Sequence, residues 1–119
     1  MATLTAKLTL TSSAATSDAL NLTATDTLTI SKKIIGISRV ILPGSSADLT
    51  LFASGTYSRS YVYLKNTDSS IAMDVDFATI ASFNLAPGEF AFFPWHASQN
   101  IVVAADSGTP VLEYALFEA

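Results

Sequence analysis

Polar and apolar residues alternate from the start of the chain. Leu4, Ala6, Leu8 and Leu10 occupy every second position, and the residues between them are threonines and one lysine. A period of two places each kind of side chain on one side of an extended strand, so this segment predicts a half-buried β-strand. The alternation returns over Leu20–Ile30, after a connection of serine, alanine, threonine and aspartate that has turn composition.

The rest of the chain contains short β-branched or aromatic segments separated by Gly, Pro, Asn, Asp and Ser, and no segment has helical periodicity. We therefore predict an all-β fold, an antiparallel β-sandwich or jelly roll of about eight or nine short strands. The polar loop Asn66–Ser70 predicts that the segments on either side of it form a β-hairpin. Besides the two N-terminal segments, the predicted strands are Ile34–Leu42, Asp48–Ser54, Tyr57–Lys65, Ile71–Ile80, Glu89–Trp95, Ile101–Ala105 and Val111–Phe117.

A length of 119 residues supports a single domain. Residues 1–30 differ from the remainder because they are rich in threonine and contain no aromatic residue, glycine or proline. Two interpretations of this segment remain open: it supplies the first strands of the sandwich, or it is an N-terminal arm exchanged with a neighbouring subunit. In the second case, strand addition to the neighbour would satisfy the backbone groups of the arm.

Charged residues make up 13% of the chain and hydrophobic residues 50%, with a formal net charge of −4. An average soluble domain is roughly 25% charged, so we expect part of this surface to face another protein. The negative balance argues against nucleic acid as a partner, because a phosphate-binding surface needs clustered Lys and Arg.

The N-terminal segment lacks the continuous apolar run of a signal peptide, and no apolar stretch approaches the roughly 20 residues of a membrane-spanning helix. We therefore expect a protein made in the cytoplasm without a signal peptide and with no membrane partner. The chain contains no cysteine, which excludes disulfides, thiolate nucleophiles and thiolate metal sites.

Few residues could carry catalysis. His96 is the only histidine, which is too few for a histidine-based metal site, and no G-x-S-x-G motif accompanies it. Asp74 and Asp76 share a face of a predicted strand at roughly 7 Å, a spacing that suits paired carboxylates or calcium but also an ordinary charged solvent face. The five glycines are isolated, so no phosphate loop or dinucleotide motif exists. We predict that the protein is not an enzyme and binds no cofactor or metal.

Aromatic residues gather in Glu89–Trp95. Alternation places Phe90 and Phe92 on one face of this strand and Phe93 and Trp95 on the other, so both faces are apolar. Such a strand lies either at the centre of a covered sheet or between the core and a neighbouring subunit.

A second aromatic group, Tyr57, Tyr61 and Tyr63, is expected to share one face of an earlier strand. An exposed aromatic face serves as a subunit contact or as a platform for sugars. For the subunit interface we predict Phe90, Phe92, Phe93, Trp95, Tyr61 and Tyr63.

Two segments of the C-terminal half carry a family resemblance. Leu85–Trp95 reads LAPGEFAFFPW and Ile101–Tyr114 reads IVVAADSGTPVLEY. The L-x-P-G-E turn before an aromatic strand, and the closing S-G-T hairpin, resemble the endings of small virion proteins of tailed bacteriophages. The resemblance covers about Tyr61 to Ala119 and implies a structural role as a capsid decoration (cement), neck or tail-associated subunit, with no catalytic residues.

These observations predict a non-enzymatic virion structural protein that acts through homo-oligomeric assembly. Its partners would be further copies of itself and other virion proteins, such as a major capsid or tail protein. Few charges and abundant serine and threonine suit a subunit that is buried among many symmetric copies. The alternative is a carbohydrate- or receptor-binding β-sandwich module, with a glycan as its ligand.

Overall fold

The computed structural model of the chain describes residues 2–119, excepting the side chains of residues 33–35. Met1, the first residue of the predicted arm, lies outside this range. The chain divides into two compact units, Met1–Lys32 and Lys33–Ala119.

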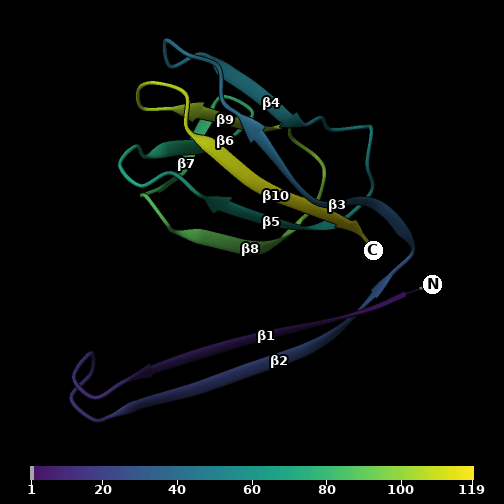
Figure 1. Cartoon of the computed structure of the whole chain (residues 1–119). Helices are drawn as coiled ribbons and strands as arrows, with labels where there is room; N and C mark the ends of the chain where they lie inside the picture. The colour runs from purple at the N-terminus through teal and green to yellow at the C-terminus, as the bar shows by residue number, and fades with distance from the viewer. Residues whose placement is uncertain (1) are drawn as a thin grey trace. The chain divides into compact units, whose positions relative to one another are not determined.

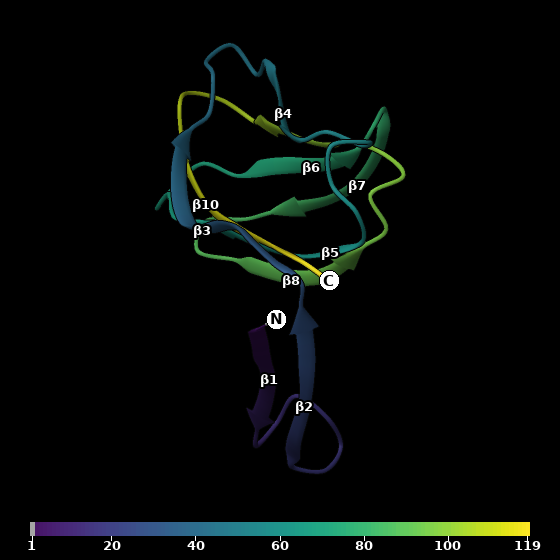
Figure 2. The same ribbon diagram turned by 90° about the vertical axis from the view of Figure 1, so that its right-hand side faces the viewer.

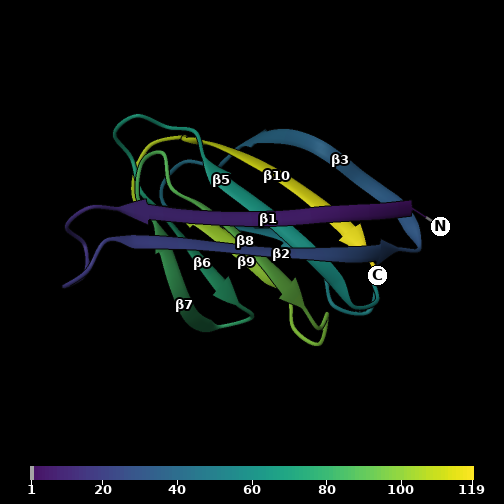
Figure 3. The same cartoon turned by 90° about the horizontal axis from the view of Figure 1, so that it is seen from below.

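The N-terminal unit is a β-hairpin. Strands β1 (Ala2–Ser12) and β2 (Leu20–Ile30) pair antiparallel along their whole length, with Ala2 opposite Ile30 and Ser12 opposite Leu20 (Figure 3). The hydroxyl of Ser12 begins the connecting turn, because it accepts hydrogen bonds from the backbone N–H groups of Ala14 and Ala15. Both strands were predicted by the alternation of threonine with leucine and alanine.

The second unit is an antiparallel β-sandwich of eight strands, with one sheet stacked on the other (Figures 1 and 2). One sheet has the strand order β3-β10-β5-β8 and the other has the order β4-β9-β6-β7. The strands are β3 (Lys32–Ile41), β4 (Asp48–Phe52), β5 (Ser60–Asn66), β6 (Met73–Phe77), β7 (Ile80–Leu85), β8 (Phe90–Trp95), β9 (Ile101–Ala105) and β10 (Val111–Glu118).

The strand order follows a nested pattern. The first strand of the sandwich lies beside the last, the second beside the seventh, the third beside the sixth, and the fourth beside the fifth. This is the order produced when one long antiparallel ribbon wraps on itself, which defines a jelly roll. The predicted fold class is therefore confirmed.

The core consists of the inward positions of both sheets. Along β5 the burial alternates strictly, so that Val62 and Leu64 are fully buried while Tyr61 and Tyr63 between them are not. Phe52 lies at the centre of an aromatic group, in edge-to-face contact with Tyr57 and Tyr114. The buried core comprises Leu42, Phe52, Val62, Leu64, Met73, Val75, Leu85, Trp95, Ala97, Ile101, Val103, Ala105, Leu112 and Leu116.

One buried polar residue joins the two sheets. The Asn66 side chain is fully buried at the end of β5, and its amide donates to the carbonyl oxygens of Ile71 and Leu85 at 2.8 and 3.0 Å. Its side-chain oxygen accepts the N–H of Asp68 at 3.0 Å. These bonds pair the polar groups where the chain crosses from one sheet to the other. From the sequence, Asn66 was assigned only to a polar loop.

The predicted hairpin between Tyr57–Lys65 and Ile71–Ile80 is wrong. The two segments lie in different sheets, because β5 pairs with β10 and β8, whereas β6 pairs with β7 and β9. The segment Ile71–Ile80 also ends earlier than predicted: Ala78 adopts a φ of 56°, and the chain reverses into the separate strand β7. A polar loop between two strands signals a reversal of direction, but it does not say whether the chain stays in the same sheet.

The last two strands, expected as a closing hairpin, likewise belong to different sheets. Strand β9 pairs with β4 and β6, and β10 pairs with β5. The predicted Pro87-Gly88 turn is present: the N–H of Glu89 donates to the carbonyl of Ala86 at 3.0 Å, and Gly88 has a φ of 83°. This conformation at the third turn position is that of a type II turn and favours glycine.

Candidate interaction surfaces

The outer side of the β3-β10-β5-β8 sheet is predominantly apolar. The register places Tyr63 between Phe92 and Ala115, and Tyr61 between Pro94 and Phe117, all on the side opposite the core. We call this surface the aromatic face and define it by Ile37, Arg39, Ile41, Tyr61, Tyr63, Lys65, Phe90, Phe92, Pro94, Glu113, Ala115 and Phe117.

Large side chains of the aromatic face are open to water in a single copy. Phe90 is 63% exposed and Phe92 41%, while Ile37 and Ile41 on β3 are 72% and 67% exposed. The rings of Tyr61 and Phe92 stack with centroids 6.3 Å apart and planes inclined by 13°. The Arg59 guanidinium lies 5.8 Å from the centre of the Tyr61 ring. Exposed apolar side chains gathered on one flat surface mark an interaction site more often than scattered ones do.

The charged groups of the aromatic face form a small cluster around Glu113. Its carboxylate accepts hydrogen bonds from the Arg39 guanidinium at 3.1 Å and from the Tyr63 hydroxyl at 2.9 Å. The Tyr63 hydrogen bond, followed by the Arg39 hydrogen bond and the Arg39 and Lys65 charges, lowers the pKa of the Glu113 carboxyl. Partial burial and the same carboxylate raise the pKa of Tyr63. This cluster is the charged part of an otherwise largely apolar surface.

The structure separates the six residues predicted for the interface into two groups. Tyr61, Tyr63, Phe90 and Phe92 lie together on the aromatic face. Phe93 and Trp95 point toward the core, where Trp95 is only 4% exposed and its indole N–H donates to the carbonyl of Gln99. Strand β8 is an edge strand, so it does not lie at the centre of a sheet, the first of the two expected settings. The second setting, beside a neighbouring subunit, stays a prediction.

Tyr57 does not share the face of Tyr61 and Tyr63, contrary to the sequence prediction. It precedes β5 and packs against Phe52 and Trp95 on the core side. The predicted strand Tyr57–Lys65 began three residues too early, and alternation can be extrapolated only within a strand.

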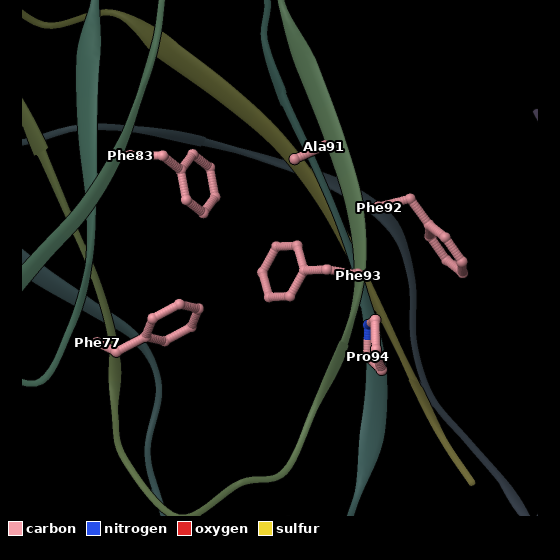
Figure 4. A pocket seen from close by; sticks show the side chains of 6 residues that line it. All are labelled: Phe77, Phe83, Ala91, Phe92, Phe93 and Pro94. Atoms are coloured by element: carbon pink, nitrogen blue, oxygen red, sulfur yellow. The ribbon is translucent and has the colours of Figure 1, made fainter.

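A groove of about 420 Å³ opens between the edge strands β7 and β8 (Figure 4). The Phe93 ring packs edge-to-face with Phe77 and Phe83, each at 5.9 Å, whereas the Phe92 ring points to the other side of β8. Ala91, Phe92 and Pro94 complete the lining, and none of the lining side chains is titratable.

The outer side of the β4-β9-β6-β7 sheet is different in character. Asp74 and Asp76 lie on this surface, opposite the buried side chains of Met73 and Val75, and Asp74 accepts a hydrogen bond from the Asn84 amide at 2.7 Å. We call it the polar face and define it by Asp48, Thr50, Asp74, Asp76, Ala81, Asn84, Val102 and Ala104.

Among the candidate catalytic residues, Asp74 and Asp76 share one face of β6, as predicted. His96 is exposed in the loop after β8, and Asp74 and Asp76 belong to the polar face. Within residues 2–119 no three His, Cys, Asp or Glu side chains gather as a metal site would require. The same range holds no helix of the length and apolarity needed to cross a membrane.

The hairpin unit also has two unlike faces. The register pairs Thr3 with Thr29 and Thr5 with Thr27 on one side, and Leu4 with Leu28 and Leu10 with Leu22 on the other. The threonine side carries Thr3, Thr5, Lys7, Thr9, Thr11, Asn21, Thr23, Thr25, Thr27 and Thr29. The other side, which we call the leucine face, carries Ala2, Leu4, Ala6, Leu8, Leu10, Ser12, Leu20, Leu22, Ala24, Asp26, Leu28 and Ile30.

The β3 contribution to the aromatic face was missed in the sequence. Ile37, Arg39 and Ile41 point outward while Val40 and Leu42 are directed inward, but the segment reads as one continuous β-branched run. The signal was the position of Arg39 between two isoleucines, because a charged side chain at the centre of a strand marks the exposed side. No family model, curated protein or solved structure matches the chain.

Proposed function

We propose that this protein is a non-enzymatic structural subunit that assembles into a homo-oligomer through its aromatic face. The observation that carries the proposal is the exposure of Phe90, Phe92, Ile37 and Ile41 on one flat sheet surface. Each Å² of this apolar surface that a partner covers would stabilise the assembly by about 25 cal/mol. A second protein surface suits this face as a partner, because aromatic side chains and arginine, here Tyr61, Tyr63, Phe92 and Arg39, are enriched in contacts between proteins.

We further propose that the assembly is part of a virion of a tailed phage, as a capsid decoration (cement) protein or another head, neck or tail subunit. The support is the resemblance of Leu85–Trp95 and Ile101–Tyr114 to such proteins, together with a jelly-roll topology, which recurs in viral capsid proteins. In a virion the other partner would be a major capsid or tail protein. Many copies of the subunit would be arranged with symmetry, so that each copy makes the same contacts.

A second candidate is a carbohydrate- or receptor-binding module, because jelly rolls also occur in lectins. The stacked rings of Tyr61 and Phe92, with Arg59 beside them, form an exposed aromatic platform with a nearby hydrogen-bonding group. Trp95 is buried and would not report on sugar binding at this platform. A glycan that binds this protein on a glycan array would then be titrated into it. A change in the chemical shift or line width of the Tyr61 NMR signals would favour this candidate.

The experiment that tests the proposal is multi-angle light scattering of the full-length protein over a wide concentration range, combined with binding to purified phage heads and tails. We expect a defined oligomer, and co-sedimentation with one of the two particles. A protein that is monomeric at high concentration and binds neither particle would refute the structural role and leave the binding module.

A further inference from the structure

Two separate apolar surfaces of the chain have large side chains that are open to water in a single copy. One is the aromatic face. The other is the leucine face, on which Leu8, Leu10 and Leu22 are 42–45% exposed, whereas Leu28 and Ile30 at its other end are buried. A two-stranded hairpin without a packed layer is only marginally stable in water. The eleven-residue strands β1 and β2 therefore need a cover on their leucine face.

We propose that the leucine face of one copy docks onto the aromatic face of a second copy. This inference rests on the proposed homo-oligomeric function and specifies the contact that produces it. The docked hairpin would form a third layer on the sandwich, at the spacing of about 10 Å that separates packed sheets. Its threonine side would then face water.

The charges favour this partner over a second hairpin. Asp26 lies on the leucine face, opposite Ala6, whereas Lys7 lies on the threonine side, so the leucine face carries an anion and no cation. Two hairpins packed through their leucine faces would bury Asp26 without a counter-charge, which is costly. The aromatic face carries two cations, Arg39 and Lys65, against one anion.

Within the aromatic face, Glu113 already accepts from Arg39 and Tyr63. Lys65 lies directly opposite Glu113 in the register between β5 and β10. The Lys65 ammonium is therefore the group that we assign to Asp26 of the docked copy.

The area argues for reciprocal docking. Eleven residues at about 3.3 Å each and two strands at about 4.8 Å give the leucine face an upper limit of roughly 36 by 10 Å, or about 360 Å². The end of this face that carries Leu28 and Ile30 is already buried, so the area open to a partner is smaller. One docking event would thus bury at most about 700 Å² in total, which is below the roughly 1,000 Å² expected of a specific interface. A two-fold exchange, in which each copy donates one hairpin and receives one, doubles the buried area, to at most about 1,400 Å². We therefore infer a reciprocal pair.

Face-to-face packing also suits the edge strands better than strand addition does. The edge strand β8 contains Pro94, which lacks an N–H group, and proline on an edge interrupts pairing with an added strand. Strands β1 and β2 already pair with each other along their whole length. At the β8 edge we therefore favour a packed layer over the strand addition that the sequence suggested for the arm.

The test uses the absence of cysteine from the chain. Full-length Leu8→Cys and full-length Phe92→Cys are mixed and treated with a short bismaleimide that reaches about the 10 Å between packed sheets. The matched control is Thr9→Cys, which moves the thiol to the other side of the same strand. We expect several-fold more covalent dimer of the two different variants with Leu8→Cys than with Thr9→Cys.

Equal yields from Leu8→Cys and Thr9→Cys would overturn the docking. So would cross-links that form only within a single chain carrying both Leu8→Cys and Phe92→Cys, since the hairpin would then cover its own sandwich. Light scattering of the same samples separates the two proposals. An oligomer without the face-specific cross-link refutes the docking alone, whereas a monomer refutes the assembly function itself.

A charge exchange gives a second readout. Asp26→Lys and Lys65→Asp should each weaken the dimer, and the chain that carries both changes should recover it. Failure of the double variant to recover dimerisation, with both single variants folded and weakened, would overturn the assigned pair.

Discussion

The two sheets of the sandwich have similar inner sides but outer sides of different character. Inward, both sheets present apolar side chains such as Leu64 on β5 and Val75 on β6, each fully buried. Outward, the β4-β9-β6-β7 sheet presents three aspartates and no cation, while the β3-β10-β5-β8 sheet presents exposed phenylalanines. The fold requires the inner pattern alone. The outer side chains can therefore differ between the two sheets without changing the fold. Of these two outer faces, the aromatic face is the one that exposes phenylalanine side chains to water.

The largest loss of stability is expected from substitutions in the core, to which both sheets contribute buried apolar side chains. Leu64→Ala in one sheet and Met73→Ala in the other each empty a fully buried site. Both should lower the free energy of unfolding by about 2–5 kcal/mol, as large-to-small core changes do. Chemical denaturation would measure both. A change below about 1 kcal/mol in one sheet only would mean that this sheet is not packed as described.

A smaller effect should distinguish two asparagines, one between the sheets and one on the polar face. Asn66→Ala would leave the carbonyls of Ile71 and Leu85 without the amide that they share, so we expect a loss of about 1–3 kcal/mol. Asn84→Ala removes only an exposed hydrogen bond to Asp74 and should stay within about 0.5 kcal/mol. Comparable losses in the two variants would contradict the structural role given to Asn66.

The aromatic face should contribute little to the stability of the monomer. At a concentration where the protein is dissociated, Phe92→Ala removes the stack on Tyr61 and should cost about 0.5–1.5 kcal/mol. A loss as large as that of Leu64→Ala would show that Phe92 is part of the core rather than of a contact surface. Thermal unfolding at low concentration measures this difference.

The smallest expected effect is a pH dependence that belongs to Glu113. Because hydrogen bonds from Tyr63 and Arg39 lower its pKa in the folded state, the unfolded chain binds the proton first as pH falls. The contribution of Glu113 to stability is thus present above the ordinary carboxyl pKa of about 4 and is lost as pH falls through the lowered value. Glu113→Gln should flatten this part of the stability profile. An unchanged profile would mean that the carboxylate does not hold the cluster.

The fold class followed from the sequence because alternation and turn residues are local. The strand Ile101–Ala105 was predicted with its observed bounds, and the N-terminal alternation anticipated both hairpin strands. The sheet to which each strand belongs could not be predicted. That choice depends on contacts such as those of Asn66, which link residues far apart in the jelly roll.

The candidate surface was predicted in part for the same reason. Phe90, Phe92, Tyr61 and Tyr63 were recognised as a group by their spacing, and β5 does pair with β8. Alternation also separated Phe93 and Trp95 from them, but it could not say which side of the strand would be the core. The contributions of β3 and β10, and hence the cluster around Glu113, depend on strand neighbours that the sequence does not specify.

The central claim is that the aromatic face, and not the polar face, joins one copy to another. Sedimentation equilibrium of two charge-matched double variants tests it directly: Phe90→Lys with Phe92→Lys on the aromatic face, and Thr50→Lys with Asn84→Lys on the polar face. We predict a folded monomer for the first variant and the wild-type oligomer for the second, with circular dichroism measuring the β fold of both. Wild-type assembly of the first variant, or equal loss in both, would contradict the claim.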